Sequence, residues 1–255
     1  MLESTLLSRI LRPAELAAVF QPVIDVAGPG RRGHYYEGLI RGPRGTSVES
    51  PEILFEYARR KRSLPAVDRA CVEAILAAAS ALPGEPRLGI NVHAPTLALD
   101  PGFIGFLTLA AERWDVAAER LVVEIVEHAA PWDIGALKRA LADLRNLGIR
   151  VALDDVGLGQ SNYLMMVECK PDYFKIDRHF VTDCHRDFHK RAVLRSIAAL
   201  ALQFGSQVIA EGVETMADLE TVNATGISLV QGWLFGHPCP AFAGMQALES
   251  GASVA

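Results

Sequence analysis

Short apolar runs alternate with longer amphipathic stretches along almost the whole sequence. This alternation is typical of strand–helix units arranged around a parallel sheet. Eight of the runs are predicted to be strands: residues 19–26, 34–41, 87–93, 120–127, 150–155, 173–177, 207–212 and 228–235. Glycine follows three of the predicted helices, at Gly148, Gly205 and Gly226, where a helix is expected to end shortly before the next strand.

The connection between the first two predicted strands is too short to hold a crossover helix. It consists of the glycine-rich residues 27–33. A connection of this length joins antiparallel strands, whereas parallel strands need a dozen residues or more. We therefore expect a TIM-like (β/α)8 barrel in which the first strand is antiparallel to its neighbours.

The length of 255 residues suits one barrel of this kind, and the sequence shows no internal repeat, linker or low-complexity segment. One domain over residues 1–255, with a core at about 15–245, is the expected organisation. The formal net charge of −5 argues against broad nucleic-acid binding, so DNA is not expected as a partner. Whether the chain is part of a longer protein stays open.

The sequence contains no feature that predicts a membrane or secreted protein. No stretch reaches the ~18 apolar residues of a membrane span. Glu3 comes early, and no basic segment precedes an apolar run, which argues against a signal peptide. The four cysteines are scattered and form no CxxC pair, as expected for a reducing compartment. A cytoplasmic location is the expectation.

Polar residues stand at or near the carboxyl ends of seven of the eight predicted strands. They are Glu37, Asn91, Glu124, the pair Asp154 and Asp155, Lys175, Glu211 and Gln231. A barrel brings the carboxyl ends of all its strands to one mouth, so the five carboxylates among these residues should converge. One lysine cannot neutralise five acids, and oxygen ligands of this kind suit magnesium or manganese better than zinc. Taken singly, each residue could instead be a strand-end polar group or, like the Asp pair, a helix cap.

The same residues carry a resemblance to a known family. Glu37-Gly38-Leu39-Ile40-Arg41 is similar to the Glu-Ala-Leu-Leu-Arg segment that names the EAL domain family. Further segments resemble that family in the same order along about 220 residues: Phe20-Gln21-Pro22-Val23-Ile24-Asp25, Asn91-Val92, Glu124-Ile125-Val126-Glu127, Asp154-Asp155, Phe174-Lys175-Ile176-Asp177, Ile209-Ala210-Glu211-Gly212-Val213-Glu214-Thr215 and Gln231-Gly232-Trp233-Leu234-Phe235-Gly236. The ordered series is far more specific than any one of its segments.

The resemblance implies a phosphodiesterase that hydrolyses cyclic-di-GMP to linear pGpG with two divalent metal ions, Mg²⁺ or Mn²⁺. Glu37, Asn91, Glu124 and Asp154 would hold one metal, and Asp154 would bridge to a second that Asp155 helps to bind. The two ions would lower the pKa of a water held between them, and the resulting hydroxide would attack phosphorus in line with the leaving 3′-oxygen.

The resemblance also implies roles for other residues. Lys175 would orient or stabilise the nucleophile, and Glu211 would act as a base or anchor the metal ligands. Beside Glu37 and Asn91, the expected substrate contacts are Gln21 and Gln231 by hydrogen bonds, Leu39 against a guanine and Arg41 on a phosphate. Glu127 resembles the glutamate that anchors the loop after the fifth strand, which links the metal site to the interface of a homodimer. A regulatory domain or partner protein stays open.

Two departures from the family pattern affect these expectations. Gly38 replaces an alanine, which is a mild change. The larger departure is the loop over residues 156–162, where Val156, Leu158 and Gln160 replace phenylalanine, threonine and tyrosine. This loop leaves open a second hypothesis, a catalytically weak or inactive cyclic-di-GMP receptor. A third, a protein-interaction module that binds neither metal nor nucleotide, does not require a ring of carboxylates.

Overall fold

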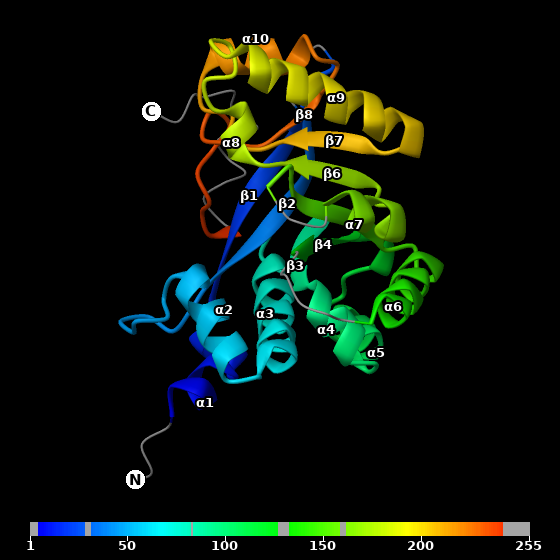
Figure 1. Cartoon of the computed structure of the whole chain (residues 1–255). Helices are drawn as coiled ribbons and strands as arrows, with labels where there is room; N and C mark the ends of the chain where they lie inside the picture. The colour runs from blue at the N-terminus through cyan, green and yellow to red at the C-terminus, as the bar shows by residue number, and fades with distance from the viewer. Residues whose placement is uncertain (1–4, 29–31, 83, 127–132, 159–161, 242–255) are drawn as a thin grey trace.

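The computed structural model describes residues 5–28, 32–82, 84–126, 133–158 and 162–241. Eight strands pair in chain order and close into a barrel (Figure 1). The strands are β1 (Ala17–Asp25), β2 (Arg32–Arg41), β3 (Leu88–His93), β4 (Leu121–Val126), β5 (Arg150–Val156), β6 (Tyr173–Ile176), β7 (Gln207–Ala210) and β8 (Leu229–Val230). The predicted α/β barrel is confirmed.

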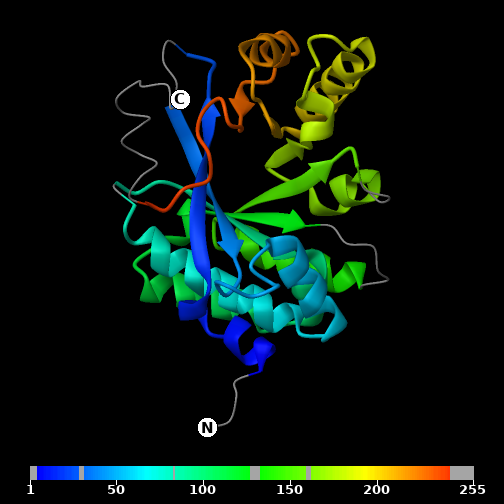
Figure 2. The same ribbon diagram turned by 90° about the vertical axis from the view of Figure 1, so that its left-hand side faces the viewer.

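Strand β1 runs antiparallel to both of its neighbours, as predicted from the short connection that follows it. It pairs with β2 in a register that sets Gln21 opposite Glu37, and with β8 in a register that sets Ile24 opposite Val230. The other pairs, from β2 through β8, are parallel. Figure 2 shows β1 and β2 as long strands that run side by side along one side of the barrel.

Helices lie outside the barrel. They are α1 (Leu6–Ile10), α2 (Pro51–Arg60), α3 (Leu64–Ala79), α4 (Ala94–Leu99), α5 (Phe103–Arg113), α6 (Ile134–Asn146), α7 (Asn162–Cys169), α8 (Arg178–Val181), α9 (Phe188–Phe204) and α10 (Met216–Asn223), with short 3₁₀ turns at η1 (Pro13–Glu15) and η2 (Ala118–Arg120). The three glycines predicted to follow helices do so: Gly148, Gly205 and Gly226 come after α6, α9 and α10. Their φ angles are 75°, 70° and 88°, a conformation that is unfavourable for residues with a side chain. Within the described ranges, none of the helices has the length and apolarity needed to cross a membrane.

The last strand is much shorter than predicted. The apolar run suggested a strand over residues 228–235, but β8 contains only Leu229 and Val230. Beyond β8 the backbone bonds to the loop after β7: Val213 donates to the carbonyl of Gln231 at 3.0 Å, and Leu234 donates to the carbonyl of Val213 at 3.2 Å. At Gly232 a Cβ atom would lie 2.2 Å from the Val213 oxygen, so only glycine allows this approach.

The barrel interior is built in layers. Seven buried apolar or aromatic side chains form one interior cluster: Val23, Tyr35, Val122, Ala152, Tyr173, Ile209 and Leu229. On β2, β4, β5 and β6, the residue two positions after each of these is polar. Glu211 and Gln231 follow Ile209 and Leu229 in the same way, just beyond β7 and β8. Side chains two residues apart share one face of a strand, so a polar layer lies directly above the apolar one.

Candidate metal centre

Lys175 lies at the centre of the polar layer. Its side chain is 1% exposed on β6, and its ammonium contacts four carboxylates that come from four other strands or their ends. The distances from Lys175 Nζ are 2.5 Å to Glu124 Oε2, 2.7 Å to Glu211 Oε1, 3.1 Å to Asp154 Oδ1 and 3.3 Å to Glu37 Oε2. The structure thus brings together acids that are separated by up to 174 positions between Glu37 and Glu211.

Glu37 is held from both sides by amide groups. Asn91 Nδ2 donates to Oε1 at 2.7 Å, and Gln231 Nε2 donates to Oε2 at 2.8 Å. Burial alone would raise the pKa of Glu37, but Lys175 and these two hydrogen bonds lower it below its usual value. Glu37 is therefore the carboxylate that the site keeps ionised. It lies inside β2, which ends at Arg41 as the predicted strand over residues 34–41 does.

Among the described residues, the remaining acids of the cluster are near only one positive charge, the ammonium of Lys175, and their pKa values are raised. Burial and the charge of Glu37 raise the pKa of Glu124 to about 8. Burial is also the main cause that raises the pKa of Asp154, and it raises that of Glu211 well above its usual value. Lys175 stays protonated, because the four carboxylates raise its pKa despite its burial. All four acids could be ionised together only if cations besides Lys175 neutralised their charge, as bound divalent ions would.

Asp154, Asp155 and Glu211 form a group whose oxygens could hold a metal ion. One carboxylate oxygen from each of them lies within 4.8 Å of the others. Burial, followed by the charges of Asp154 and Asp177, raises the pKa of Asp155 to about 6. Asp155 adopts a φ of 54°, an unusual conformation for a residue that is not glycine. These oxygen ligands fit magnesium or manganese.

A cavity of about 250 Å³ opens onto this cluster. Of the residues singled out in the sequence, it is lined by Gln21, Glu37, Leu39, Asp154, Lys175, Glu211 and Gln231. Six further lining residues were not among the predicted site residues: Asp177, Arg178, Gly212, Glu214, Gly232 and Trp233. They follow β6, β7 and β8 within a few residues, so a search of the segments after the strand ends would have found them.

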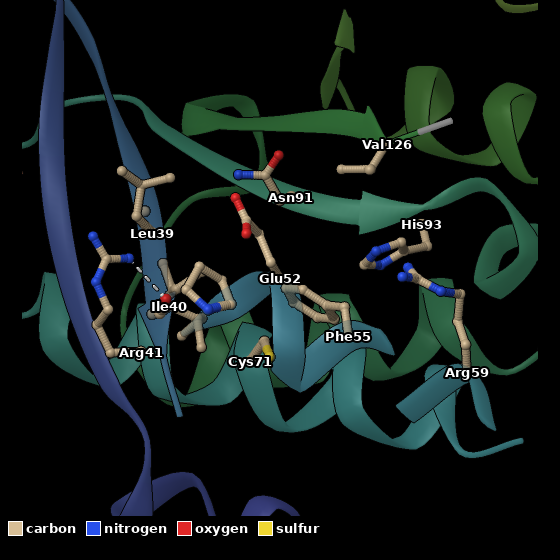
Figure 3. A pocket seen from close by; sticks show the side chains of 13 residues that line it. Leu39, Ile40, Arg41, Glu52, Phe55, Arg59, Cys71, Asn91, His93 and Val126 are labelled. Carbon is tan, nitrogen blue, oxygen red and sulfur yellow. Dashed lines mark hydrogen bonds between the residues drawn. The ribbon is translucent and has the colours of Figure 1, made fainter. Parts of the chain in front are cut away.

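A second cavity, of about 310 Å³, lies beside α2 and α3 (Figure 3). Leu39 lines both cavities, whereas Asn91 and Arg41 line only the second. Arg41 Nη1 donates to the carbonyl of Ile40 at 2.9 Å, so its guanidinium is held on the wall of the second cavity. Glu124 and Asp155 line neither cavity. Glu127 lies outside the described residues, and its role as a loop anchor stays a prediction.

Gly38, in the segment Glu37–Arg41, packs closely against Ile75 of α3. A Cβ atom at Gly38 would lie 2.6 Å from Ile75 Cγ2 and 3.1 Å from Ile75 Cγ1. Ile75 is only 1% exposed and cannot move toward solvent. Ile75 thus occupies the space that an alanine methyl group would need at position 38.

We expect Gly38→Ala to lower the free energy of unfolding by about 1–3 kcal/mol, the usual cost of overpacking a core. Ile75→Val alone should cost about 0.5–1.5 kcal/mol through the cavity that it leaves. In the double variant the two costs should partly cancel, because the smaller valine makes room for the methyl group. Urea unfolding of the two single variants and the double variant measures this coupling. Strictly additive costs would show that the two positions do not compete for space.

Comparison with known proteins agrees with the fold. The EAL domain family matches residues 5–238, so the chain belongs to this family. The probable cyclic di-GMP phosphodiesterase PdeA of Escherichia coli is 27% identical, with 90% of this chain and 31% of PdeA covered. The cyclic di-GMP phosphodiesterase NbdA of Pseudomonas aeruginosa is 28% identical, with 92% and 30% covered. The chain thus spans less than a third of the length of these relatives.

Among solved structures, BlrP1 of Klebsiella pneumoniae in a complex with calcium and cyclic-diGMP superposes with a TM-score of 0.80. The two chains are 28% identical, with 91% of this chain and 58% of that chain covered. A manganese and cyclic-diGMP complex of BlrP1 gives a TM-score of 0.78 at 26% identity, with 90% and 61% covered. These neighbours have the same barrel as this chain.

Proposed function

We propose that this domain is a metal-dependent phosphodiesterase that hydrolyses cyclic-di-GMP to linear pGpG. The observation that carries the proposal is the buried cluster of four carboxylates around the single ammonium of Lys175. The names of PdeA and NbdA and the metal–dinucleotide complexes of BlrP1 support it. Chromatography of cyclic-di-GMP after incubation with the purified protein and Mn²⁺ or Mg²⁺ tests it.

Two groups of residues would hold two divalent ions in this proposal. Glu37, Asn91, Glu124 and Asp154 would hold the first, and Asp154 would be shared with the second, to which Asp155 also contributes. The excess of buried negative charge and the oxygen-only ligands support this assignment. When bound, the ions would neutralise the carboxylates and lower the pKa of the attacking water.

The other residues of the site would position the dinucleotide and move protons. Glu211 lines the carboxylate cavity beside Lys175 and would accept the proton of the attacking water. Lys175, which stays protonated, would stabilise the negative charge that develops at the attacked phosphate. Gln21 and Gln231 would donate hydrogen bonds to the dinucleotide, Leu39 would pack on a base, and Arg41 would contact a phosphate.

We also propose that the domain forms a homodimer through the segment after β5. Helix α7 exposes Tyr163, Leu164 and Val167, which are 77%, 48% and 54% accessible, and Leu158 just before it is 54% accessible. Exposed apolar side chains gathered on one short segment are typical of an interaction surface. The same segment follows Asp155, so it would connect the dimer interface to the metal centre.

A cyclic-di-GMP receptor with little activity is the second candidate, and the altered segment over residues 156–162 favours it. Val156 is fully buried, where it pairs with Ile176 of β6, whereas Leu158 is exposed. A phenylalanine would overpack the site of Val156, which usually costs about 1–3 kcal/mol. Gln160 lies outside the described residues.

If the altered loop slows the reaction, the triple change Val156→Phe, Leu158→Thr and Gln160→Tyr should raise kcat by about tenfold, equivalent to ~1.4 kcal/mol. The double change Leu158→Thr and Gln160→Tyr avoids the overpacking at Val156 and serves as the second variant. Initial rates of pGpG formation at saturating cyclic-di-GMP measure the effect. An unchanged kcat in both folded variants would show that the loop does not limit turnover.

A further inference from the structure

Tyr35 belongs to the interior layer of apolar and aromatic side chains directly below the carboxylate cluster, and it is 1% exposed. Among the residues that the structure describes, its hydroxyl has no hydrogen-bond partner. Tyr173 of the same layer is equally buried, but its hydroxyl accepts a hydrogen bond from Arg150 Nη1 at 2.7 Å and lies 2.9 Å from His34 Nε2. A buried hydroxyl without a partner costs stability, so phenylalanine would suit position 35 better in the metal-free protein.

Glu124 has one carboxylate oxygen that nothing orients. The side chain is fully buried, and its Oε2 contacts Lys175 Nζ at 2.5 Å. Its Oε1 accepts no hydrogen bond from the residues that the structure describes. Glu37 differs, because Asn91 and Gln231 donate to its two oxygens. Carboxylates that ligate a metal are usually held by hydrogen bonds of their own, and Glu124 lacks such a bond at Oε1.

Gly89 allows Tyr35 and Glu124 to meet inside the barrel. It lies on β3, the strand between β2, which carries Tyr35, and β4, which carries Glu124. A Cβ atom at Gly89 would lie 2.0 Å from Glu124 Oε1 and 2.8 Å from Tyr35 Cε2. The unpartnered oxygen and the edge of the phenol ring therefore share the space that a side chain at position 89 would need. After burial, the charge of Glu124 is the largest cause that raises the pKa of Tyr35, as expected for neighbouring groups.

We propose that Tyr35 positions Glu124 for metal binding by donating a hydrogen bond to its Oε1; this inference rests on the metal centre of the proposed function. The hydroxyl would hold the carboxylate in one orientation, so less side-chain freedom is lost when an ion binds. Tyr35 and Lys175 would then hold the two oxygens of Glu124, as Asn91 and Gln231 hold those of Glu37. Tyr35 acts through Glu124 and takes no part in the chemistry, so it is a positioning residue.

Two matched tyrosine variants test the inference without measuring turnover. Tyr35→Phe should weaken Mn²⁺ binding about tenfold in a calorimetric titration, a usual effect of removing the partner of a metal ligand. In EDTA the same variant should unfold at an unchanged or higher urea concentration, because it loses an unpartnered hydroxyl. Tyr173→Phe should do the opposite. It should lower the urea midpoint, because it removes the hydroxyl that Arg150 and His34 contact, and it should leave Mn²⁺ affinity within about twofold of the wild type.

The outcomes separate this inference from the proposed function. If Tyr35→Phe binds Mn²⁺ as tightly as the wild type, the hydroxyl does not position Glu124, and the inference is overturned while the metal centre stands. Parallel losses of Mn²⁺ affinity and of stability in EDTA would show that Tyr35 supports the fold, which also overturns it. Mn²⁺ binding that depends on Tyr35 in a protein that forms no pGpG supports the inference while it overturns hydrolysis. No Mn²⁺ binding by the wild type overturns both.

Discussion

Replacing Lys175 with methionine is expected to lower the free energy of unfolding of the metal-free protein by about 3–5 kcal/mol. The ammonium of Lys175 is the shared counter-ion of Glu37, Glu124, Asp154 and Glu211. Methionine has a similar length but no charge, so the variant leaves the four acids without a cation in a buried site. Urea unfolding in EDTA measures the loss.

Two further measurements identify charge as the cause. Lys138→Met is the matched control, because Lys138 pairs with Glu168 at 2.5 Å but is itself 56% exposed, so the loss there should stay below about 1 kcal/mol. Saturating Mn²⁺ should restore much of the stability of Lys175→Met, because the ions would supply the missing positive charge. A loss equal to that of Lys138→Met, or no response to Mn²⁺, would contradict this account.

The pH dependence follows from the raised pKa of the buried acids. Glu124, with a pKa of about 8, binds a proton more tightly in the folded protein than its usual value of 4.5 allows in the unfolded chain. Its protonated form therefore stabilises the metal-free fold fully below about pH 4.5, and this contribution is lost as the pH rises through 8. Because methionine at position 175 raises the pKa of Glu124 further, the gap in stability between variant and wild type should widen as the pH rises through about 8.

Asp154→Asn is expected to lower the rate of cyclic-di-GMP hydrolysis by about 10³-fold, equivalent to ~4 kcal/mol of transition-state stabilisation. Asp154 lies between the two groups of proposed ligands: it contacts Lys175 at 3.1 Å and belongs to the cluster with Asp155 and Glu211. Asparagine keeps the shape of the side chain and removes one negative charge that both ions would share. Initial rates of pGpG formation and calorimetric titration with Mn²⁺ measure the two effects.

Asp143→Asn makes the same chemical change at an exposed position of α6 and should leave rate and metal affinity unchanged. Loss of metal affinity together with loss of rate identifies Asp154 as a ligand. If Asp154→Asn binds Mn²⁺ as tightly as the wild type, Asp154 does not hold the metal, whatever happens to the rate.

The barrel could be predicted from the sequence because local patterns encode it. The apolar run of β4 is typical of a buried strand. The connection after β1 is too short for a crossover helix, so it predicts an antiparallel pair. The end of β8 could not be predicted in this way. After Val230 the chain is still apolar, and it leaves the strand because of hydrogen bonds to Val213, which lies 17 positions earlier.

The candidate site, like the barrel, could be predicted only in part from the sequence. The polar residues of the cluster were visible because each stands near the carboxyl end of an apolar run. The packing of Gly38 against Ile75 could not be predicted, because neither residue is unusual alone. Only the fold places them so that a Cβ atom at position 38 would lie 2.6 Å from Ile75 Cγ2. Asp68 received no chemical role from the sequence. In the structure it is fully buried and accepts hydrogen bonds from the backbone and ring of His93 and from Thr96, at 3.2, 2.9 and 2.5 Å.

Hydrolysis is tested directly by incubating the purified protein with cyclic-di-GMP and Mn²⁺ or Mg²⁺ and separating the products by chromatography. A Glu37→Ala variant serves as the control, because it removes the carboxylate that Asn91, Gln231 and Lys175 hold in place. We expect pGpG to accumulate with the wild type only when the metal is present, and not to form with the variant. Tight binding of cyclic-di-GMP without any pGpG, with both metals and at high enzyme concentration, would contradict it and identify the domain as a receptor.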